Sequence, residues 1–231
     1  MTTARLLYFS DILCVWAYVA QRRIDQLTET FGERVRIDAH VCSVFPDVKE
    51  KIARQWGHRG GQQGYGEHVQ QVLEGFPHVS LHPDTWVRTV PATSAGAHMF
   101  LKAVELIERP AETDAEPAAY PDRPSTAAAH ALRHAFFAEG RDISDWDVHA
   151  EIAQQIGIEQ KDIEAEIKSS RALAALEADY ALCQQHGIGG SPTVVLNEGR
   201  QRLFGNVGYR LIEANVHEVL EGAHPDEASW C

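Results

Sequence analysis

The first 31 residues constrain the fold most, because a short apolar segment leads directly into a long helical pattern. Residues 5–9 form an apolar and aromatic run that suits a buried strand, and Ser10 and Asp11 then interrupt it. No Gly or Pro follows from Cys14 until Gly32, so we predict a helix over 14–31. A thiol at a helix N-terminus lies beside unpaired N–H groups and the positive end of the helix dipole, and both favour the thiolate.

A second strand is predicted over residues 35–42, with Gly32 as the end of the preceding helix. Its weak alternation suits a buried strand parallel to the first, with a right-handed connection. Functional sites in parallel sheets form at the carboxyl ends of the strands. Cys14 follows the first strand and Cys42 closes the second, so we expect both thiols at the same end of the sheet.

Residues 46–186 are predicted to be mostly helical, and two loops interrupt them. The Gly- and Gln-rich stretch 57–66 is predicted to be a mobile loop, and residues 109–125, with four Pro and several acids, a solvated loop. The helices are expected over 68–73, 93–108, 126–139, 146–156, 161–168 and 171–186.

The last segment returns to an α/β pattern. A Gly-rich stretch, 187–192, ends in Ser191 and Pro192 and precedes the apolar run 193–196. The Asn-Glu-Gly sequence at 197–199 predicts a hairpin turn, with 201–204 pairing back. A helix is expected over 209–220.

This plan resembles the thioredoxin fold, and specifically the DsbA-like family. That family includes cytoplasmic disulfide-isomerase-like proteins, kappa-class glutathione transferases and 2-hydroxychromene-2-carboxylate isomerases. Three segments carry the resemblance, namely 9–16, 137–143 and 187–195. It implies an α/β, thioredoxin-like fold with a large helical insertion. The thioredoxin-like domain would comprise 1–45 and 187–222, the insertion 46–186 and a tail 223–231.

The resemblance also implies a site. Cys14 matches the nucleophilic Cys of the family, or the catalytic Ser of its transferase and isomerase branches. Pro192 matches a cis-proline, which presents the backbone of Ser191 to an extended substrate. The expected substrate-binding residues are Asp11, Val15, Trp16, Ala17, Ser191 and Pro192.

Ala17 departs from the family pattern, because the dithiol members have a second Cys at this position. A Cys14 mixed disulfide would then need another thiol to release it. Free glutathione, Cys42 and Cys231 are the candidates, whereas Cys183 is expected to be buried. We therefore predict a monothiol disulfide oxidoreductase or isomerase that acts on protein or glutathione disulfides. Glutathione would be a co-substrate, and no cofactor would be tightly bound.

Two other functions remain open at this point. One is a glutathione-dependent transferase or isomerase that acts on a small apolar molecule. The other is a non-catalytic protein that binds peptides in the groove beside Pro192, a reading that Ala17 favours. His40 shares a strand face with Cys42 and could contribute to the pocket.

Composition argues against several other classes. The net charge of −12 and pI of about 5.4 disfavour nucleic acid and anionic membranes as partners. No apolar run approaches the roughly 20 residues of a membrane span. The four Cys are scattered and the twelve His form only weak pairs, so no metal site is expected. The N-terminus lacks a signal-peptide pattern, so we expect a cytoplasmic location. A homodimer is an open expectation, because DsbA-like proteins often dimerise.

Overall fold

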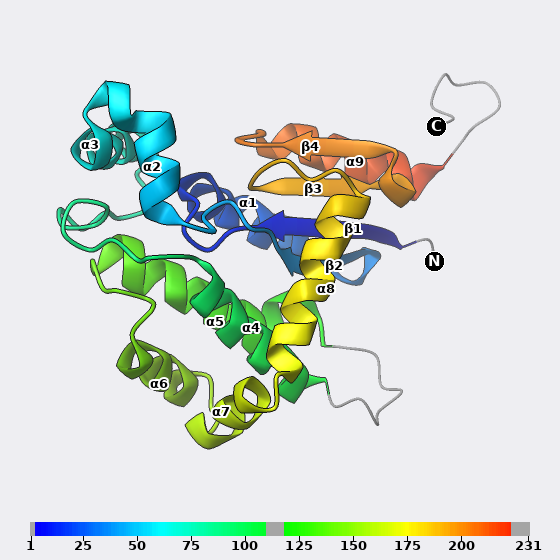
Figure 1. Ribbon diagram of the computed structural model, residues 1–231. Helices are drawn as coiled ribbons and strands as arrows, with labels where there is room; N and C mark the ends of the chain where they lie inside the picture. Colours follow the sequence, from blue (N-terminus) through cyan, green and yellow to red (C-terminus); the bar gives the residue numbers. More distant parts are fainter. Residues whose placement is uncertain (1–2, 110–117, 223–231) are drawn as a thin grey trace.

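The computed structural model of the chain describes residues 3–109 and 118–222, and a four-stranded mixed sheet lies at its centre (Figure 1). The strands are β1 (Ala4–Ser10), β2 (Val35–Val41), β3 (Thr193–Leu196) and β4 (Gln201–Phe204), in the order β2-β1-β3-β4. β1 and β2 are parallel, whereas β1–β3 and β3–β4 are antiparallel. The predicted strands and the hairpin between β3 and β4 are confirmed.

Helices cover both faces of the sheet. α1 (Val15–Phe31) and α9 (Tyr209–Glu221) lie on one face, and α8 (Arg171–Gln185) crosses the other (Figure 1). Two separate apolar clusters result, because successive side chains of a strand point to opposite faces. The first joins Leu6 and Ile37 to Ile24 and Ile212, and the second joins Phe9 and Val195 to Cys183.

The remaining helices also come from the segment between β2 and β3. They are α2 (Val48–Trp56), α3 (Gly61–Glu74), α4 (Ala95–Glu108), α5 (Pro124–Arg133), α6 (Trp146–Gln155) and α7 (Gln160–Lys168). α4 packs against α5, α7 and α8, and a π-helical turn, His134–Ala138, continues α5. No helix of the described residues is long and apolar enough to cross a membrane.

The prediction of a mobile loop over 57–66 is wrong. Gly57–Arg59 form a 3₁₀ turn, and α3 begins at Gly61. Tyr65, Val69 and Leu73 recur every four residues and are all buried. Their packing outweighs the low helix propensity of glycine, since most helical stability in proteins comes from tertiary contacts.

α2 was not predicted. Its N-cap is Asp47, whose carboxylate accepts the amide of Glu50 at 2.8 Å. Of the loop predicted over 109–125, residues 110–117 lie outside the described residues, and α5 already begins at Pro124. The predicted division at 45/46 and 186/187 stays a prediction. The structure adds that α8 contacts both α4 and β2.

Candidate active site around Cys14

The turn between β1 and α1 places Cys14 at the N-cap of α1. Its backbone is extended (φ −80°, ψ 116°), and its carbonyl oxygen accepts the amides of Ala17 and Tyr18. The side chain makes no capping hydrogen bond to the helix. The thiol is therefore available to a partner from another element.

That partner is the loop before β3. The Ser191–Pro192 peptide bond is cis, and the Cys14 thiol donates to the Ser191 carbonyl oxygen at 3.2 Å. The Ser191 hydroxyl in turn accepts the amide of Asp11 at 2.9 Å. The antiparallel pairing of Phe9 with Thr193 sets this alignment. The predicted cis-proline beside Cys14 is thus present.

The environment of the Cys14 thiol favours its protonated form. Only 6% of the residue is exposed, and burial raises its pKa. The Ser191 side chain and the amides of Ala17 and Trp16 act in the opposite direction, but Asp11 adds to the rise. Our expectation of a resting thiolate is wrong, because the low polarity around the sulfur outweighs the helix N-terminus.

Asp11 organises this turn. Its carboxylate accepts the amides of Leu13, Val44 and Phe45 at 2.8–3.0 Å, and the Ser94 hydroxyl at 2.9 Å. Asp11 has no exposed surface, and these four donors surround its carboxylate. In this structure Asp11 holds the Cys14 turn to the segment after β2 and to the start of α4, and its role in substrate binding stays a prediction.

His98 on α4 holds the same turn. Its Nε2 atom accepts the amide of Ile12 at 3.1 Å. Burial lowers the pKa of His98, which keeps the ring neutral and able to accept. Sequence analysis missed both His98 and Ser94. The only available signal was the position of Ser94 immediately before a predicted helix.

The three residues after Cys14 differ in how much of their surface is exposed to solvent. Val15 and Ala17 are buried, with 5% and 0% exposed, and their contact with substrate stays a prediction. Trp16 is partly exposed, and its ring packs edge-on against Phe76 at 6.0 Å. Trp16 therefore stays a candidate for contact with substrate.

Cys42 lies at the same end of the sheet as Cys14, as expected. Its Sγ atom is 4.0 Å from the Gly190 carbonyl oxygen, one residue before the oxygen that Cys14 contacts. Burial raises the pKa of Cys42 strongly. Burial also raises the pKa of Cys183, to about 11. The role of Cys42 as a resolving thiol stays a prediction, and Cys231 lies outside the described residues.

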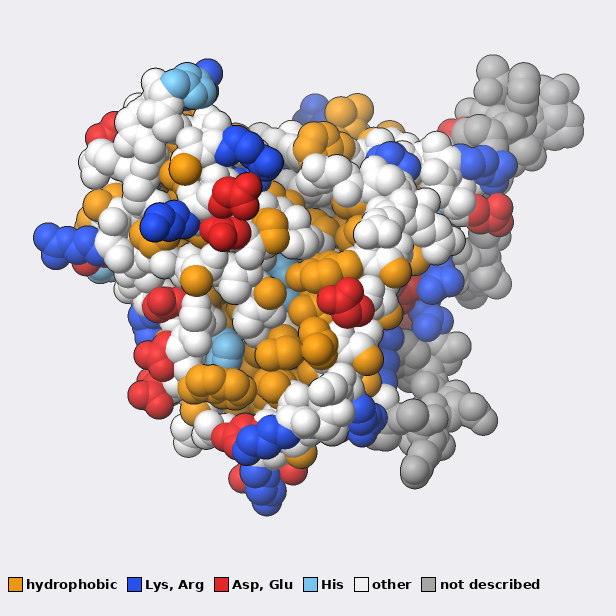
Figure 2. Space-filling view, viewed as in Figure 1, with side chains coloured by type: hydrophobic (Ala, Val, Ile, Leu, Met, Phe, Trp, Pro, Cys, Tyr) orange, Lys and Arg blue, Asp and Glu red, His pale blue; other side chains and the backbone are white. Residues whose placement is uncertain are grey.

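A groove of about 610 Å³, which we call the Cys42 groove, opens beside this pair of cysteines. It lies between α2 and the end of α8, and Figure 2 shows charged side chains of both signs over α2. Its lining includes Cys42, Lys51, Arg54, Tyr180, Ile188 and Gly190. Burial lowers the pKa of Lys51, while Asp11 and Cys14 raise it, so this cation lies within electrostatic reach of the Cys14 sulfur.

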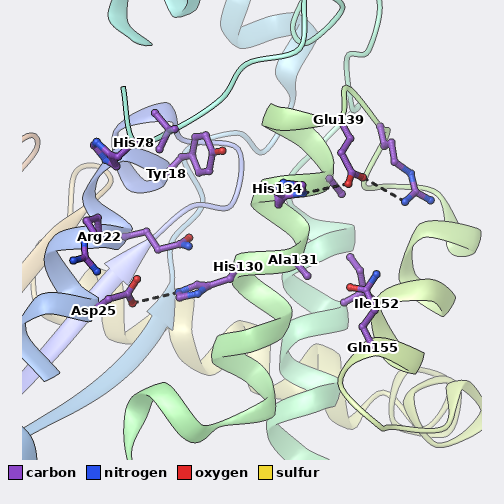
Figure 3. A pocket seen from close by; sticks show the side chains of 14 residues that line it. Tyr18, Arg22, Asp25, His78, His130, Ala131, His134, Glu139, Ile152 and Gln155 are labelled. Atoms are coloured by element: carbon purple, nitrogen blue, oxygen red, sulfur yellow. Dashed lines mark ion pairs between the residues drawn. The ribbon is translucent and has the colours of Figure 1, made fainter. Parts of the chain in front are cut away.

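A second groove, of about 520 Å³, runs between α1 and the helices α5 and α6 (Figure 3). We call it the Tyr18 groove after Tyr18, which lines it and lies one helical turn beyond Cys14. His130 lies 3.7 Å from Asp25, and His134 lies 3.2 Å from Glu139. Burial raises the pKa of Asp25 to about 6 and lowers that of His130 to about 4. Such a charged lining suits a polar ligand better than an apolar one.

His40 belongs to a buried ionic network. Its Nδ1 atom lies 2.8 Å from an Asp179 carboxylate oxygen, and its ring stacks on Phe9. The Lys102 ammonium lies 2.6 Å from both Asp179 and Glu105. The network joins β2, α4 and α8. Within the described residues, no group of three or more His, Cys, Asp or Glu is arranged to hold a metal ion.

The sheet order, the helical segment between β2 and β3 and the cis-proline opposite the α1 N-terminus define a thioredoxin-like fold of the DsbA type. Residues 118–216 match the model of the family described as DSBA-like thioredoxin domain. The matched span includes Ser191 and Pro192 but not Cys14. This part of the chain is therefore similar to a DSBA-like thioredoxin domain. Among curated proteins, none matches the sequence.

Solved structures share this fold over nearly the whole chain. A probable DsbA oxidoreductase from Streptomyces coelicolor has 17% identity and a TM-score of 0.71, covering 97% of this chain and 93% of its own. The cytosolic disulfide reductase DsbM from Pseudomonas aeruginosa, solved with GSH, has 19% identity and a TM-score of 0.65, covering 92% and 99%. A 2-hydroxychromene-2-carboxylate isomerase has 15% identity and a TM-score of 0.62, covering 93% and 95%.

Proposed function

We propose that this protein is a monothiol disulfide oxidoreductase or isomerase, with Cys14 as nucleophile and glutathione as the resolving thiol. The observation that carries the proposal is the contact between the Cys14 thiol, at the N-terminus of α1, and the carbonyl before cis-Pro192. The name of DsbM and its structure with GSH support this choice. A reducing compartment with abundant glutathione, such as the cytoplasm, suits this chemistry.

Substrate binding would activate the thiol. An extended substrate that donates an N–H to the Ser191 carbonyl displaces the Cys14 thiol from its acceptor. The Cys14 proton passes to solvent, and the thiolate is stabilised by the Ala17 and Trp16 amides and by nearby Lys51.

Two exchange steps then complete the reaction. The Cys14 thiolate attacks the glutathionyl sulfur of a mixed disulfide, forms Cys14–S–S–glutathione and releases the substrate thiolate, which takes up a proton. A second glutathione thiolate attacks the glutathionyl sulfur of this intermediate. Oxidised glutathione leaves, and Cys14 regains its thiolate. Because position 17 is Ala, the helix offers no second Cys beside Cys14, and an external thiol, glutathione, completes the cycle.

Trapping of the intermediate tests the proposal. The protein is incubated with oxidised glutathione at pH 8, digested and analysed by mass spectrometry. We expect a glutathionyl adduct on Cys14 and catalysed reduction of a glutathionylated peptide, both lost in Cys14→Ser. Cys183→Ser is the matched control, because that buried thiol lies on α8 and should leave turnover unchanged. An unmodified Cys14, with turnover unaffected by Cys14→Ser, contradicts the proposal.

A second candidate follows from the protonated state of Cys14. A neutral thiol can donate a hydrogen bond to the sulfur of bound glutathione, as the Ser hydroxyl would in the transferase and isomerase branches. The similar 2-hydroxychromene-2-carboxylate isomerase structure supports this role. Calorimetry separates the two candidates: glutathione binding that persists in Cys14→Ser, with no adduct on the natural protein, favours the transferase or isomerase. Peptide binding without either activity favours the non-catalytic alternative.

A further inference from the structure

A small cavity lies where the sheet meets α4 and α5, separate from the two grooves described above. Its volume is about 30 Å³. We call it the Arg133 cavity, and its lining includes Tyr8, Ser10, His40, Glu105, Thr126 and Arg133. A buried water needs roughly 10–15 Å³ by a comparable measure, so the cavity has room for one monatomic ion.

Arg133 brings a buried positive charge to this cavity. The residue is 3% exposed, and arginine stays protonated in proteins. One guanidinium nitrogen donates to the Ser10 hydroxyl at 2.9 Å and another to the Gln21 amide oxygen at 3.4 Å. Its Nε atom has no hydrogen-bond partner, and Asp25 is near enough for Arg133 to lower its pKa without forming a direct ion pair with it in the described residues. A buried charge without a direct ion-pair partner is unfavourable, so a further counter-charge beside Arg133 would stabilise the site.

Tyr8 supplies a second polar group. Its hydroxyl is buried, and beyond an interaction with Ser10 it has no hydrogen-bond partner in the described residues. Burial raises the pKa of Tyr8 to about 12, while Arg133 and Ser10 lower it, which places both near the phenol. The phenol is therefore protonated at neutral pH and is a hydrogen-bond donor.

The polar groups around Arg133 are thus mainly donors. They are the Nε–H of Arg133, the hydroxyl of Tyr8 and the hydroxyl of Ser10, whose oxygen already accepts from Arg133. Glu105 is the acidic group of the lining, and the Lys102 ammonium neutralises it at 2.6 Å. Converging donors beside an unpaired guanidinium are the chemistry that binds an anion.

We propose that the Arg133 cavity binds one monovalent anion, chloride, between the Arg133 guanidinium and the Tyr8 hydroxyl. The anion neutralises Arg133 at the junction of β1, α1 and α5. It therefore stabilises the contact between the sheet and the helical part of the chain. The proposal is independent of the chemistry at Cys14.

Anion-dependent stability is the first test. Thermal unfolding is measured at constant ionic strength while sodium chloride or sodium bromide replaces sodium gluconate, whose anion is too large for the cavity. We expect a saturable rise in Tm with chloride and bromide. The rise should shrink in Tyr8→Phe and vanish in Arg133→Gln. Tyr209→Phe is the matched control, because its hydroxyl bonds Thr30 at the surface. Equal Tm values in chloride and gluconate overturn the proposal.

Bromide in crystals is the second test, and it needs no variant. Crystals of the natural protein are soaked in sodium bromide, and anomalous scattering locates the bound ions. A bromide peak between Arg133 and Tyr8 is expected. Peaks at surface positions alone, with none in the cavity, overturn the proposal even if the variants fail to fold.

Discussion

Cys14 and Ser191 lie 177 positions apart in the chain and are joined by a thiol-to-carbonyl hydrogen bond of 3.2 Å. An extended substrate would use the same Ser191 carbonyl as its acceptor. The substrate and the Cys14 thiol therefore compete for one acceptor, so substrate binding releases the thiol. A protein without a second thiol at position 17 could in this way keep its nucleophile protonated until a substrate arrives.

The first prediction concerns the titration of Cys14. Because burial raises its pKa, the rate of alkylation by iodoacetamide should stay low at neutral pH. It should rise only above the value of about 8.5 for an unperturbed thiol. Peptide mapping assigns the signal to Cys14, and Cys14→Ser supplies the background. An apparent pKa below 8.5 would show that the helix N-terminus dominates and would contradict the burial argument.

The second prediction concerns Asp11→Asn. An amide cannot accept from four donors as the carboxylate does, and one buried amide hydrogen would face another donor. Hydrogen bonds to charged groups contribute about 1.5–3 kcal/mol each, so the free energy of unfolding should fall on the order of 3 kcal/mol. Urea unfolding measures the loss.

Asp47→Asn is the control for this change, because Asp47 accepts a single amide at the exposed start of α2. Its effect should be a small fraction of that of Asp11→Asn. If the two variants lost equal stability, the Asp11 network would not be what holds the Cys14 turn.

Residues near each other in sequence allowed the most secure predictions. The strand at 5–9, the helix from Cys14 and the Gly-rich approach to Pro192 are local patterns, and the structure confirms them. The pairing of Cys14 with Ser191 followed from the family resemblance. The loop prediction at 57–66 was wrong because it relied on the low helix propensity of glycine. That propensity does not indicate that Tyr65 and Leu73 pack into the core and stabilise a helix there.

The remainder of the site depends on contacts between distant segments. Ser94 and His98 reach the turn after β1 from a helix more than 80 positions away. The protonation of Cys14 depends on how completely these segments enclose it. A single sequence carries no measure of that enclosure, so the dipole argument predicted a thiolate where the structure favours a thiol.

The third prediction concerns Lys102→Met. The Lys102 ammonium lies between Asp179 and Glu105, and 4% of its side chain is exposed. Methionine fills a similar volume but leaves both carboxylates without their cation. Breaking a buried ionic cluster by removing one partner costs about 3–5 kcal/mol, which urea unfolding would detect. Lys168→Met, on the exposed pair with Glu164, should change stability little, and an equal loss there would contradict the argument.

The fourth prediction uses the raised pKa of Asp25 in the Tyr18 groove. Burial raises this pKa from 3.8 to about 6, so the folded state holds the proton more tightly than the unfolded state. Stability associated with Asp25 is therefore gained as pH falls from about 6 towards 3.8, and ionisation above pH 6 destabilises the fold. Asp25→Asn removes that cost. The variant should have a higher Tm than the natural protein at pH 7, and the difference should disappear near pH 4.

Thermal unfolding of both proteins at several pH values checks this. Asp162→Asn, an acidic position in the first turn of α7, controls for the change of net charge. His130, whose pKa is lowered to about 4, gives the opposite slope: its stability contribution is lost as pH falls from 6.5 towards 4. In the natural protein, the stability gained from Asp25 as pH falls partly offsets the stability lost from His130. Asp25→Asn lacks that gain, so its stability should fall more steeply below pH 6 than that of the natural protein. A Tm difference that is constant with pH would show that Asp25 titrates normally.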